Sequence, residues 1–458
     1  MVGCKCLMPI MAIPIALVWF WAAKLMKEPS MPAYNESWWG PGEPRYIDDK
    51  IRPFEISVSD EILKDLKYRL EHTLPLQPAL KGTKHTYGIN TNLLQKVLHF
   101  WKNEYNWTER EAYLNQFPQF LVNIQGLDIH FIHVKPKVPK SIKVLPLLIL
   151  HGWVGSVREM YEIIPKLTTP KQGKNFVFEV IVPSLPGFAF SDGAAKKGMG
   201  SFNSSVVMKN LMKRLGFERF YVQGTDWGAS IVQAMSVMYP DKVIAMHSNM
   251  CIVNMFKGYV TNLIYAFYPT FLLDEEELKS AHMYTQSIDL SVWFYRIEET
   301  GYFHLQATKP DSLGVALRDS PIGLAAYLLE KFITLTKASY RGIDDGRLEE
   351  TYGMTALIDN IMLYWITGSI TTSMRIYAEH WSSEFPGNFD VDGISIQVPA
   401  GCARFEHDIV FYPKAVLKVK YPNLIHASFY EAGHFPALEV PDVLVDDIFE
   451  FFDKVMKL

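Results

Sequence analysis

The sequence has no excess of charge of either sign. Its 45 Lys and Arg residues and 49 Asp and Glu residues give a formal net charge of −4 over 458 residues. A nucleic-acid-binding protein usually carries a basic excess, so this class is disfavoured. Charged residues make up only 21% and hydrophobic residues 49% of the chain, and it contains no internal repeat or low-complexity tract. This composition excludes disordered, collagen-like and coiled-coil proteins.

Cysteine is scarce as well. The four cysteines are Cys4, Cys6, Cys251 and Cys402. Their spacing fits no zinc site, and two cysteines at the extreme N-terminus do not form a redox motif. So few cysteines do not form a disulfide framework, and we expect the body of the protein in a reducing compartment. Neither a metal nor a cofactor is predicted.

Only one long hydrophobic run is present. Leu7–Ala23 consists of 17 uncharged residues, at the short end of the ~17–25 residues that span a bilayer as a helix. The alternative is a cleaved signal peptide, but cleavage after Ala23 would place the bulky Trp21 where a small residue is required. We therefore predict an uncleaved membrane anchor over residues 1–27. The lysines on either side do not decide its orientation.

The length exceeds that of one compact domain, which is usually ~100–200 residues. Residues 28–120 read as a linker followed by helical periodicity. Strand and helix patterns alternate over 121–250, stop over the helix-rich and aromatic stretch 251–390, and resume over 391–458. Such alternation predicts an α/β domain with a mostly parallel sheet and helices on both faces. A helical block interrupts this domain, and an N-terminal segment precedes it.

Short apolar runs bounded by turn residues predict the strands of the core. A hairpin is expected at Gln125-Gly126. The predicted core strands are Val144–Leu150, Phe176–Val182, Phe220–Gln223, Val243–Met250, Ile394–Val398 and Leu424–Tyr430.

One turn in the core has the form of a nucleophile elbow. Gly224-Thr225-Asp226-Trp227-Gly228 follows a predicted strand and precedes a predicted helix. Its glycines let the strand and helix approach closely while the middle residue is exposed in a sharp turn. That residue is Asp226 rather than serine. The alternative is that Asp226 merely caps the helix.

Other motifs favour the nucleophile. His151-Gly152-Trp153 follows the first core strand, where hydrolases of this architecture supply an oxyanion-hole N–H. We expect the backbone N–H groups of Trp153 and Trp227 to form that hole. His434 follows the last predicted strand, and Glu406 and Asp408 follow the strand before it. Nucleophile, acid and histidine thus occur in the chain order of the α/β-hydrolase triad.

A carboxylate nucleophile narrows the chemistry. Serine attack on a saturated carbon would give an ether, which activated water does not readily cleave. Asp226 would instead give an ester, which water can hydrolyse through an oxyanion intermediate. The elbow therefore predicts displacement at a saturated carbon, in an epoxide or a halide.

The sequence resembles the microsomal-type epoxide hydrolases over nearly its whole length. Among insect members it is most similar to the juvenile hormone epoxide hydrolases, to which His247–Cys251 adds weak support. Besides the anchor and the elbow, the matching stretches are Trp38–Pro41, Ile51–Phe54, Gly126–Val134, Glu299–Tyr302 and Thr308–Pro321.

The resemblance implies a role for each candidate residue. Asp226 would be the nucleophile, and His434 the base that activates water. Asp408 would orient His434, with Glu406 as the competing acid. A pair of lid tyrosines, Tyr302 and Tyr377, would donate hydrogen bonds to the epoxide oxygen as it gains charge.

The resemblance also implies a lipophilic epoxide as substrate, juvenile hormone included. It implies an anchor in the membrane of the endoplasmic reticulum with the catalytic body in the cytosol. No nucleic-acid partner is expected, and the oligomeric state is left open.

The oxyanion loop departs from the family pattern. The family has a proline after His-Gly-X, whereas this chain has Val154. Proline favours a cis peptide bond, which costs ~2.5–4 kcal/mol before any other residue. A trans bond here would displace the Trp153 backbone, so a weakly active isoprenoid-binding protein is the second hypothesis. A haloalkane dehalogenase is the third, and the anchor and the lid tyrosines argue against it.

Overall fold

The computed structural model describes residues 26–34, 36–45, 48, 50–268, 273, 275–279 and 297–458. The predicted anchor at Leu7–Ala23 lies outside these residues. Among the helices that are described, none is long and apolar enough to cross a bilayer.

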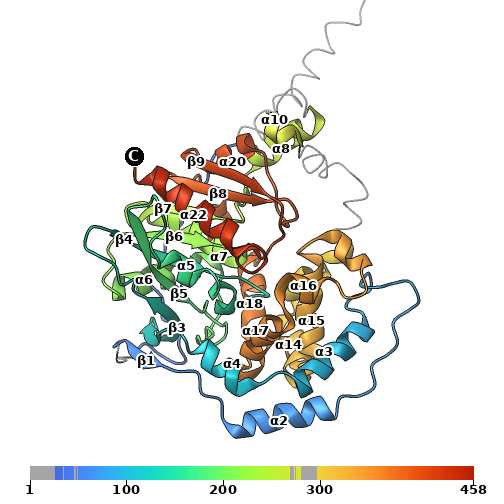
Figure 1. Cartoon of the computed structure of the whole chain (residues 1–458). Helices are drawn as coiled ribbons and strands as arrows, with labels where there is room; N and C mark the ends of the chain where they lie inside the picture. Colours follow the sequence, from blue (N-terminus) through green and yellow to red (C-terminus); the bar gives the residue numbers. More distant parts are fainter. Residues whose placement is uncertain are drawn as a thin grey trace, which may run out of the picture.

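A nine-stranded sheet forms the centre of the molecule (Figure 1). Its strand order is β1-β2-β3-β5-β4-β6-β7-β8-β9, antiparallel from β1 to β5 and parallel from β5 to β9. The strands are β1 (Arg52–Phe54), β2 (Gln119–Ile124), β3 (Leu127–Val134), β4 (Lys143–Leu150), β5 (Phe176–Pro183), β6 (Phe220–Gly224), β7 (Val243–Ser248), β8 (Ala400–Phe405) and β9 (Leu424–Tyr430).

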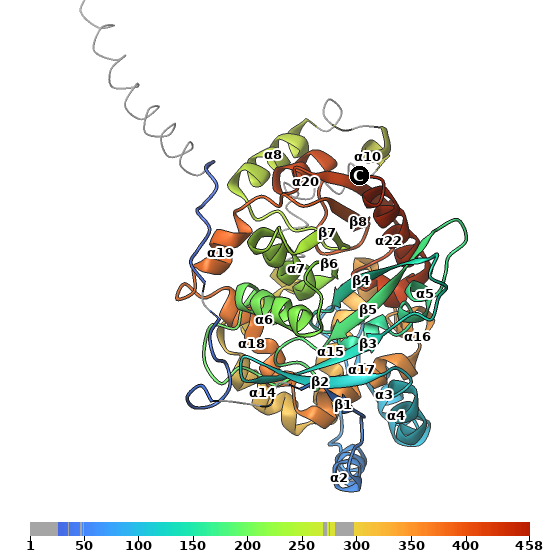
Figure 2. The ribbon, with the colours of Figure 1, turned by 90° about the vertical axis from the view of Figure 1, so that its left-hand side faces the viewer.

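The predicted hairpin joins β2 to β3. Gln125 and Gly126 both have positive φ, 53° and 89°, the conformation that two-residue hairpin turns require. The central strands β6 and β8 are buried along their whole length. Strands buried on both faces need helices on both sides, and Figure 2 shows α6 (Ser201–Arg214) and α7 (Asp226–Met238) on one side of the sheet. The other side carries α5 (Ile164–Leu167) and α22 (Pro441–Val455).

A block of helices, here called the helical insertion, lies between β7 and β8. Its α15 and α17 are almost wholly apolar and pack against each other. The described helices of the insertion are α8 (Phe256–Phe267), α10 (Glu275–Lys279), α13 (Gly301–Thr308), α14 (Pro310–Asp319), α15 (Pro321–Thr334), α16 (Leu348–Tyr352), α17 (Met354–Thr367), α18 (Ile370–His380) and α19 (Gly387–Asp392).

Three helices precede the core: α2 (Asp60–Glu71), α3 (Thr91–Asn103) and α4 (Trp107–Leu114). Helices α2 and α3 pack on α15, so the N-terminal segment lies along the outer side of the helical insertion (Figure 1). A buried ion pair strengthens this junction. The carboxylate of Asp359 on α17 accepts hydrogen bonds from Arg110 on α4 at 2.7 Å and from Arg158 in the core at 3.0 Å.

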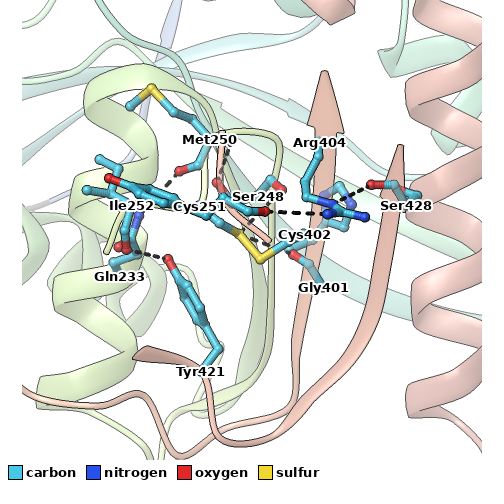
Figure 3. The surroundings of a disulfide bond; sticks show 12 residues. Gln233, Ser248, Met250, Cys251, Ile252, Gly401, Cys402, Arg404, Tyr421 and Ser428 are labelled. Atoms are coloured by element: carbon cyan, nitrogen blue, oxygen red, sulfur yellow. Dashed lines mark hydrogen bonds between the residues drawn. A yellow bond between two sulfur atoms is a disulfide. The ribbon is translucent and has the colours of Figure 1, made fainter. Parts of the chain in front are cut away.

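A disulfide between Cys251 and Cys402 joins the end of β7 to β8 (Figure 3). The expectation of reduced cysteines is wrong for this pair. The number of cysteines could not predict this disulfide, because the two residues are 151 positions apart. They meet only when β7 and β8 lie side by side in the sheet. Disulfides are rare in reducing compartments, so this bond also counts against the compartment expected from the low cysteine number.

The predicted strand Ile394–Val398 is wrong. The strand at this place in the sheet is β8, Ala400–Phe405. The predicted stretch has other partners: Ile396 N–H donates to the Lys420 carbonyl at 2.7 Å, and Lys420 Nζ donates to the carbonyls of Asp392 and Ile394. The backbone and side chain of this buried lysine thus make hydrogen bonds that a neighbouring strand would otherwise make. The small residues Ala-Gly-Cys-Ala at the start of β8 do not have a typical strand pattern, and Gly401 has to be small because a Cβ there would collide with Phe451 of α22.

Candidate active site

The elbow predicted between β6 and α7 is present. Asp226 has φ +49°, a conformation that costs a non-glycine residue energy and is found mostly at functional turns. The glycines at both ends are required, because a Cβ at Gly224 would collide with the Gly228 carbonyl, and one at Gly228 with that of Leu150. Asp226 does not cap the helix: α7 begins at Asp226 itself, after Thr225.

The oxyanion loop meets the Asp226 carboxylate. The Trp153 backbone N–H donates to Asp226 Oδ1 at 2.8 Å, and a side chain at Gly152 would collide with the same carboxylate. The Trp153–Val154 peptide bond is cis. Trp227, the other predicted oxyanion residue, makes ring contacts with Tyr377 and His380, at 4.8 Å and 5.1 Å between centroids.

His434 connects two carboxylates. Its Nε2 lies 3.4 Å from Asp226 Oδ2, and its Nδ1 lies 2.6 Å from Asp408 Oδ1. Asp408 rather than Glu406 therefore contacts the histidine. The side chains of His434 and Asp408 are fully buried, whereas that of Asp226 keeps 14% exposure. Of the two carboxylates, Asp226 is the one that faces open space.

Burial and charge act in opposite directions on this trio. Burial disfavours the imidazolium, but the carboxylates of Asp408 and Asp226 outweigh it and raise the pKa of His434 well above its usual value. Burial also raises the pKa of Asp408, against the lowering effect of His434. The two carboxylates therefore favour the protonated form of His434.

Both predicted tyrosines lie beside this trio. Tyr302 of α13 stacks on the Trp153 ring at 5.5 Å, and Tyr377 of α18 meets the same ring edge-on at 5.9 Å. Their own ring centroids are 6.2 Å apart. Burial, with the negative charge of Asp226, raises the pKa of both phenols well above the usual value. Both hydroxyls thus remain protonated.

A cavity of about 200 Å³ opens beside Asp226. Its lining combines core residues with residues of the helical insertion, and most of it is apolar. The lining residues are Asp226, Trp227, Ser230, Met250, Ile252, Asn254, Tyr302, Phe303, Tyr377, His380, Trp381, Ile409 and Val410. A carboxylate and two phenols in an otherwise apolar cavity suit a lipophilic substrate with one polar reacting group.

His151 has a structural role. Its Nδ1 lies 3.1 Å from the Gly152 carbonyl, and its Nε2 accepts a hydrogen bond from Leu185 N–H at 3.3 Å. Complete burial lowers its pKa to about 4, so the ring is neutral. It shapes the turn that presents Trp153.

Three residues around the oxyanion loop were not predicted from the sequence. Glu159 is buried with 3% exposure, and its carboxyl group occupies the space beside Gly155. On α17, Asn360 donates to the Val154 carbonyl at 2.9 Å and Tyr364 donates to the Gly155 carbonyl at 2.6 Å. None of them belongs to a motif. Asn360 and Tyr364 lie in α17, a mostly apolar helix in which only the neighbouring Asp359 and Asn360 stand out as polar.

Comparison with known proteins agrees with this geometry. Residues 51–160 match the family model described as epoxide hydrolase N terminus, and residues 146–391 match that of the alpha/beta hydrolase fold. Juvenile hormone epoxide hydrolase 1 of Ctenocephalides felis is 46% identical over 98% of this chain and 97% of its own length. Epoxide hydrolase 1 of Oryctolagus cuniculus is 40% identical over 96% of this chain and 97% of its own.

The chain belongs to the epoxide hydrolase family. The crystal structure of juvenile hormone epoxide hydrolase from Bombyx mori superposes with a TM-score of 0.88 at 43% identity, covering 92% of this chain and 99% of that one. The α/β-hydrolase fold and the classification as an epoxide hydrolase, both predicted from the elbow and the resemblance, are confirmed.

Proposed function

We propose that this epoxide hydrolase converts lipophilic epoxides, juvenile hormone among them, to diols through an ester on Asp226. One observation carries the proposal. The Asp226 carboxylate lies between the Trp153 N–H and His434 on one side and an apolar cavity that holds Tyr302 and Tyr377 on the other.

In the first step, Asp226 Oδ2 attacks an epoxide carbon and the ring C–O bond breaks. The released oxygen gains negative charge and takes a proton from Tyr302 or Tyr377. Because the pKa of both phenols is raised, they are protonated when the reaction starts. Asp226 Oδ1 stays hydrogen-bonded to the Trp153 N–H, and Oδ2, which lies 3.4 Å from His434 Nε2, makes the attack.

In the second step, water attacks Cγ of the ester and His434 Nε2 takes its proton. Ester formation removes the charge of Asp226, which is one of the two that raise the pKa of His434. His434 can therefore pass its proton to the tyrosinate left by the first step, and the neutral imidazole then acts as the base. Negative charge develops on Oδ1, where the Trp153 N–H stabilises it. The bond between Cγ and the diol oxygen then breaks, the diol oxygen takes a proton from His434, and the new Asp226 carboxyl group returns its own proton to His434.

The helical insertion acts as a lid in this proposal. It supplies Tyr302 and Tyr377 and several of the apolar cavity residues. Excluding bulk water strengthens the hydrogen bonds to the developing charge.

The proposed location is the membrane of the endoplasmic reticulum, with one anchor at Leu7–Ala23 and the body on the cytosolic side. Family analogy and the length of the apolar run support this. The disulfide would have to persist against cytosolic thiols. Its two cysteines are 7% and 0% exposed, which restricts their access to such thiols.

A turnover assay on the full chain in detergent tests the proposal. We expect diol from an isoprenoid epoxide and no halide release from a chloroalkane of the same length. Saturable binding of the isoprenoid epoxide without any diol would contradict the proposal and favour the isoprenoid-binding hypothesis that Val154 motivated. Halide release without diol formation would favour a dehalogenase.

A further inference from the structure

Helix α8 presents an apolar face to solvent. Tyr259, Leu263, Ile264 and Phe267 are exposed by 53%, 48%, 47% and 61%. Spacings of three and four place these side chains on one side of the helix. The helix contains a single charged residue, Lys257. Contiguous exposed apolar surface of this kind usually marks an interaction site.

The opposite side of α8 already has a partner. It packs on α20 (Lys414–Lys420), next to β9. Within the described residues, Gly258 and Ala266 are the buried positions of α8. Both are small, and the half-buried Tyr265 packs against the core beside them. The large apolar residues Tyr259, Leu263, Ile264 and Phe267 point to solvent instead, which a helix that only fills a core would not show.

The exposed face continues to the mouth of the active-site cavity. Tyr259 donates a hydrogen bond to Asn254 Oδ1 at 3.2 Å, and Asn254 lines the cavity. Across the mouth, Trp381 and Ile409 also line the cavity and are each exposed by 41%. A lipophilic molecule on this face would thus lie next to the cavity mouth, whose lining is mostly apolar.

The described chain, which follows the N-terminal apolar run, begins at the same end of the molecule as α8. Glu28 accepts a hydrogen bond from Ser395 N–H at 3.3 Å, and Asp392 accepts one from Asn254 at 3.2 Å. In Figure 2 the start of the described chain, α19 and α8 lie at one end of the molecule. If Leu7–Ala23 is anchored in a bilayer, α8 lies on the side that faces it.

We propose that the outer face of α8 lies in the interfacial layer of a phospholipid bilayer and admits lipophilic epoxides from the membrane to the cavity. Helices with a large apolar face bind in this layer, with lysines reaching the headgroups. The exposed Lys257 on α8 and Lys418 on α20 suit that role. The inference rests on the proposed membrane anchoring and lipophilic substrate.

Lipid photocrosslinking tests the contact without requiring turnover. The full chain is reconstituted in phosphatidylcholine vesicles that contain a photoactivatable acyl chain, and adducts are mapped by mass spectrometry. We expect adducts on Tyr259–Phe267. They should be absent at Val315 of α14, a control side chain that is apolar and 73% exposed. Equal labelling of both sites, or none on α8, would overturn the proposal.

A charge variant tests the route to the cavity. L263E/I264E should lose the adducts and raise the KM for an isoprenoid epoxide in vesicles about tenfold. The kcat for a short water-soluble epoxide should not change, and V315E should match the unsubstituted chain. A lowered Tm of L263E/I264E together with unchanged lipid adducts would mean that protein covers this face, against the proposal. If the unsubstituted chain shows no turnover at all, the proposed function is wrong, but the crosslinking result still tests the membrane contact of α8.

Discussion

At the scale of single residues, charge decides the order of events at Asp226. In the free enzyme two carboxylates share His434, whose pKa is raised. Formation of the ester removes the negative charge of Asp226, so His434 becomes a better base only after the first step. The same groups thus serve both half-reactions without a change of fold.

The first prediction concerns Asp226→Ala. Without the Asp226 charge, the pKa of His434 should fall, because only Asp408 remains to oppose burial. NMR titration of the imidazole measures this shift, and kcat should drop roughly 10⁴-fold or more, as for other triad nucleophiles. Glu406→Gln is the control and should change neither quantity. An unshifted His434 would contradict the assigned electrostatics.

The second prediction concerns the phenols. Tyr302→Phe and Tyr377→Phe should each slow ester formation about 10²-fold, the lower end of the range for general acid catalysis. The double variant should be almost inactive. Rapid quench of the ester measures this step alone. Tyr87→Phe, at a side chain exposed by 82%, should behave like the unsubstituted chain. Slower hydrolysis with unchanged ester formation would show that the phenols do not act on the epoxide oxygen.

The third prediction concerns Glu159. Burial raises its pKa to about 8, so it is a neutral acid at pH 7. An unfolded chain ionises this group near its usual pKa of about 4.5, so the folded state loses stability between pH 4.5 and 8. Glu159→Gln keeps the shape without that loss. Its Tm should exceed that of the unsubstituted chain at pH 8 and match it at pH 4.5. A Tm gain that is the same at both pH values would rule out ionisation as the cause.

At the scale of secondary-structure elements, α17 fixes the oxyanion loop. Asn360 and Tyr364 donate to the carbonyls of Val154 and Gly155, directly after Trp153. The helical insertion therefore supplies support for the loop in the core as well as cavity residues. This coupling makes the position of the Trp153 N–H depend on a helix some 200 positions away in sequence.

The fourth prediction tests that support. Tyr364→Phe leaves the buried Gly155 carbonyl without its partner, which costs about 1–3 kcal/mol of unfolding free energy. We expect kcat to fall about tenfold while KM stays within twofold, because the oxyanion is stabilised after binding. Denaturant unfolding and steady-state kinetics measure the two effects. Tyr340→Phe, on the partly exposed η2 (Ala338–Gly342), serves as the control. A change in KM alone would place Tyr364 in substrate binding instead.

The sequence correctly predicted the elements whose apolar pattern matches their burial in the fold. Strand β9 has the bounds that its apolar run indicates, and the elbow lies between strand and helix as expected. The predicted strand Ile394–Val398 is wrong because its backbone pairs with Lys420 instead: Lys420 Nζ donates to the Ile394 carbonyl, and the Ile396 N–H donates to the Lys420 backbone carbonyl. Glu159, Asn360 and Tyr364 could not be predicted, since their roles depend on contacts between segments far apart in the chain.

At the scale of the whole molecule, the helical insertion is held at both of its ends. Cys251 stands just before it and Cys402 just after it, and their disulfide closes the stretch between β7 and β8. Cys251 is next to the cavity residues Met250 and Ile252. The Tyr421 hydroxyl donates a hydrogen bond to the Ile252 carbonyl at 3.0 Å (Figure 3). The disulfide therefore fastens one wall of the cavity to the strand that leads to Asp408.

The fifth prediction follows from that closure. Cys402→Ala should lower the free energy of unfolding by about 2–4 kcal/mol, the usual effect of removing a disulfide that closes a long loop. Denaturant titration without reductant measures it. Addition of reductant should bring the unsubstituted chain to the same value. If Cys402→Ala and the reductant both leave the midpoint unchanged, the two cysteines are not bonded in solution.

The ester on Asp226 is tested most directly by a single turnover in water enriched in ¹⁸O, with enzyme in excess over an isoprenoid epoxide. Water attacks Cγ, so the label should enter the Asp226 carboxylate, within the tryptic peptide Phe220–Lys242, while the first diol stays unlabelled. A labelled first diol with an unlabelled Asp226 would mean that water attacks the epoxide directly, and the covalent mechanism would be wrong.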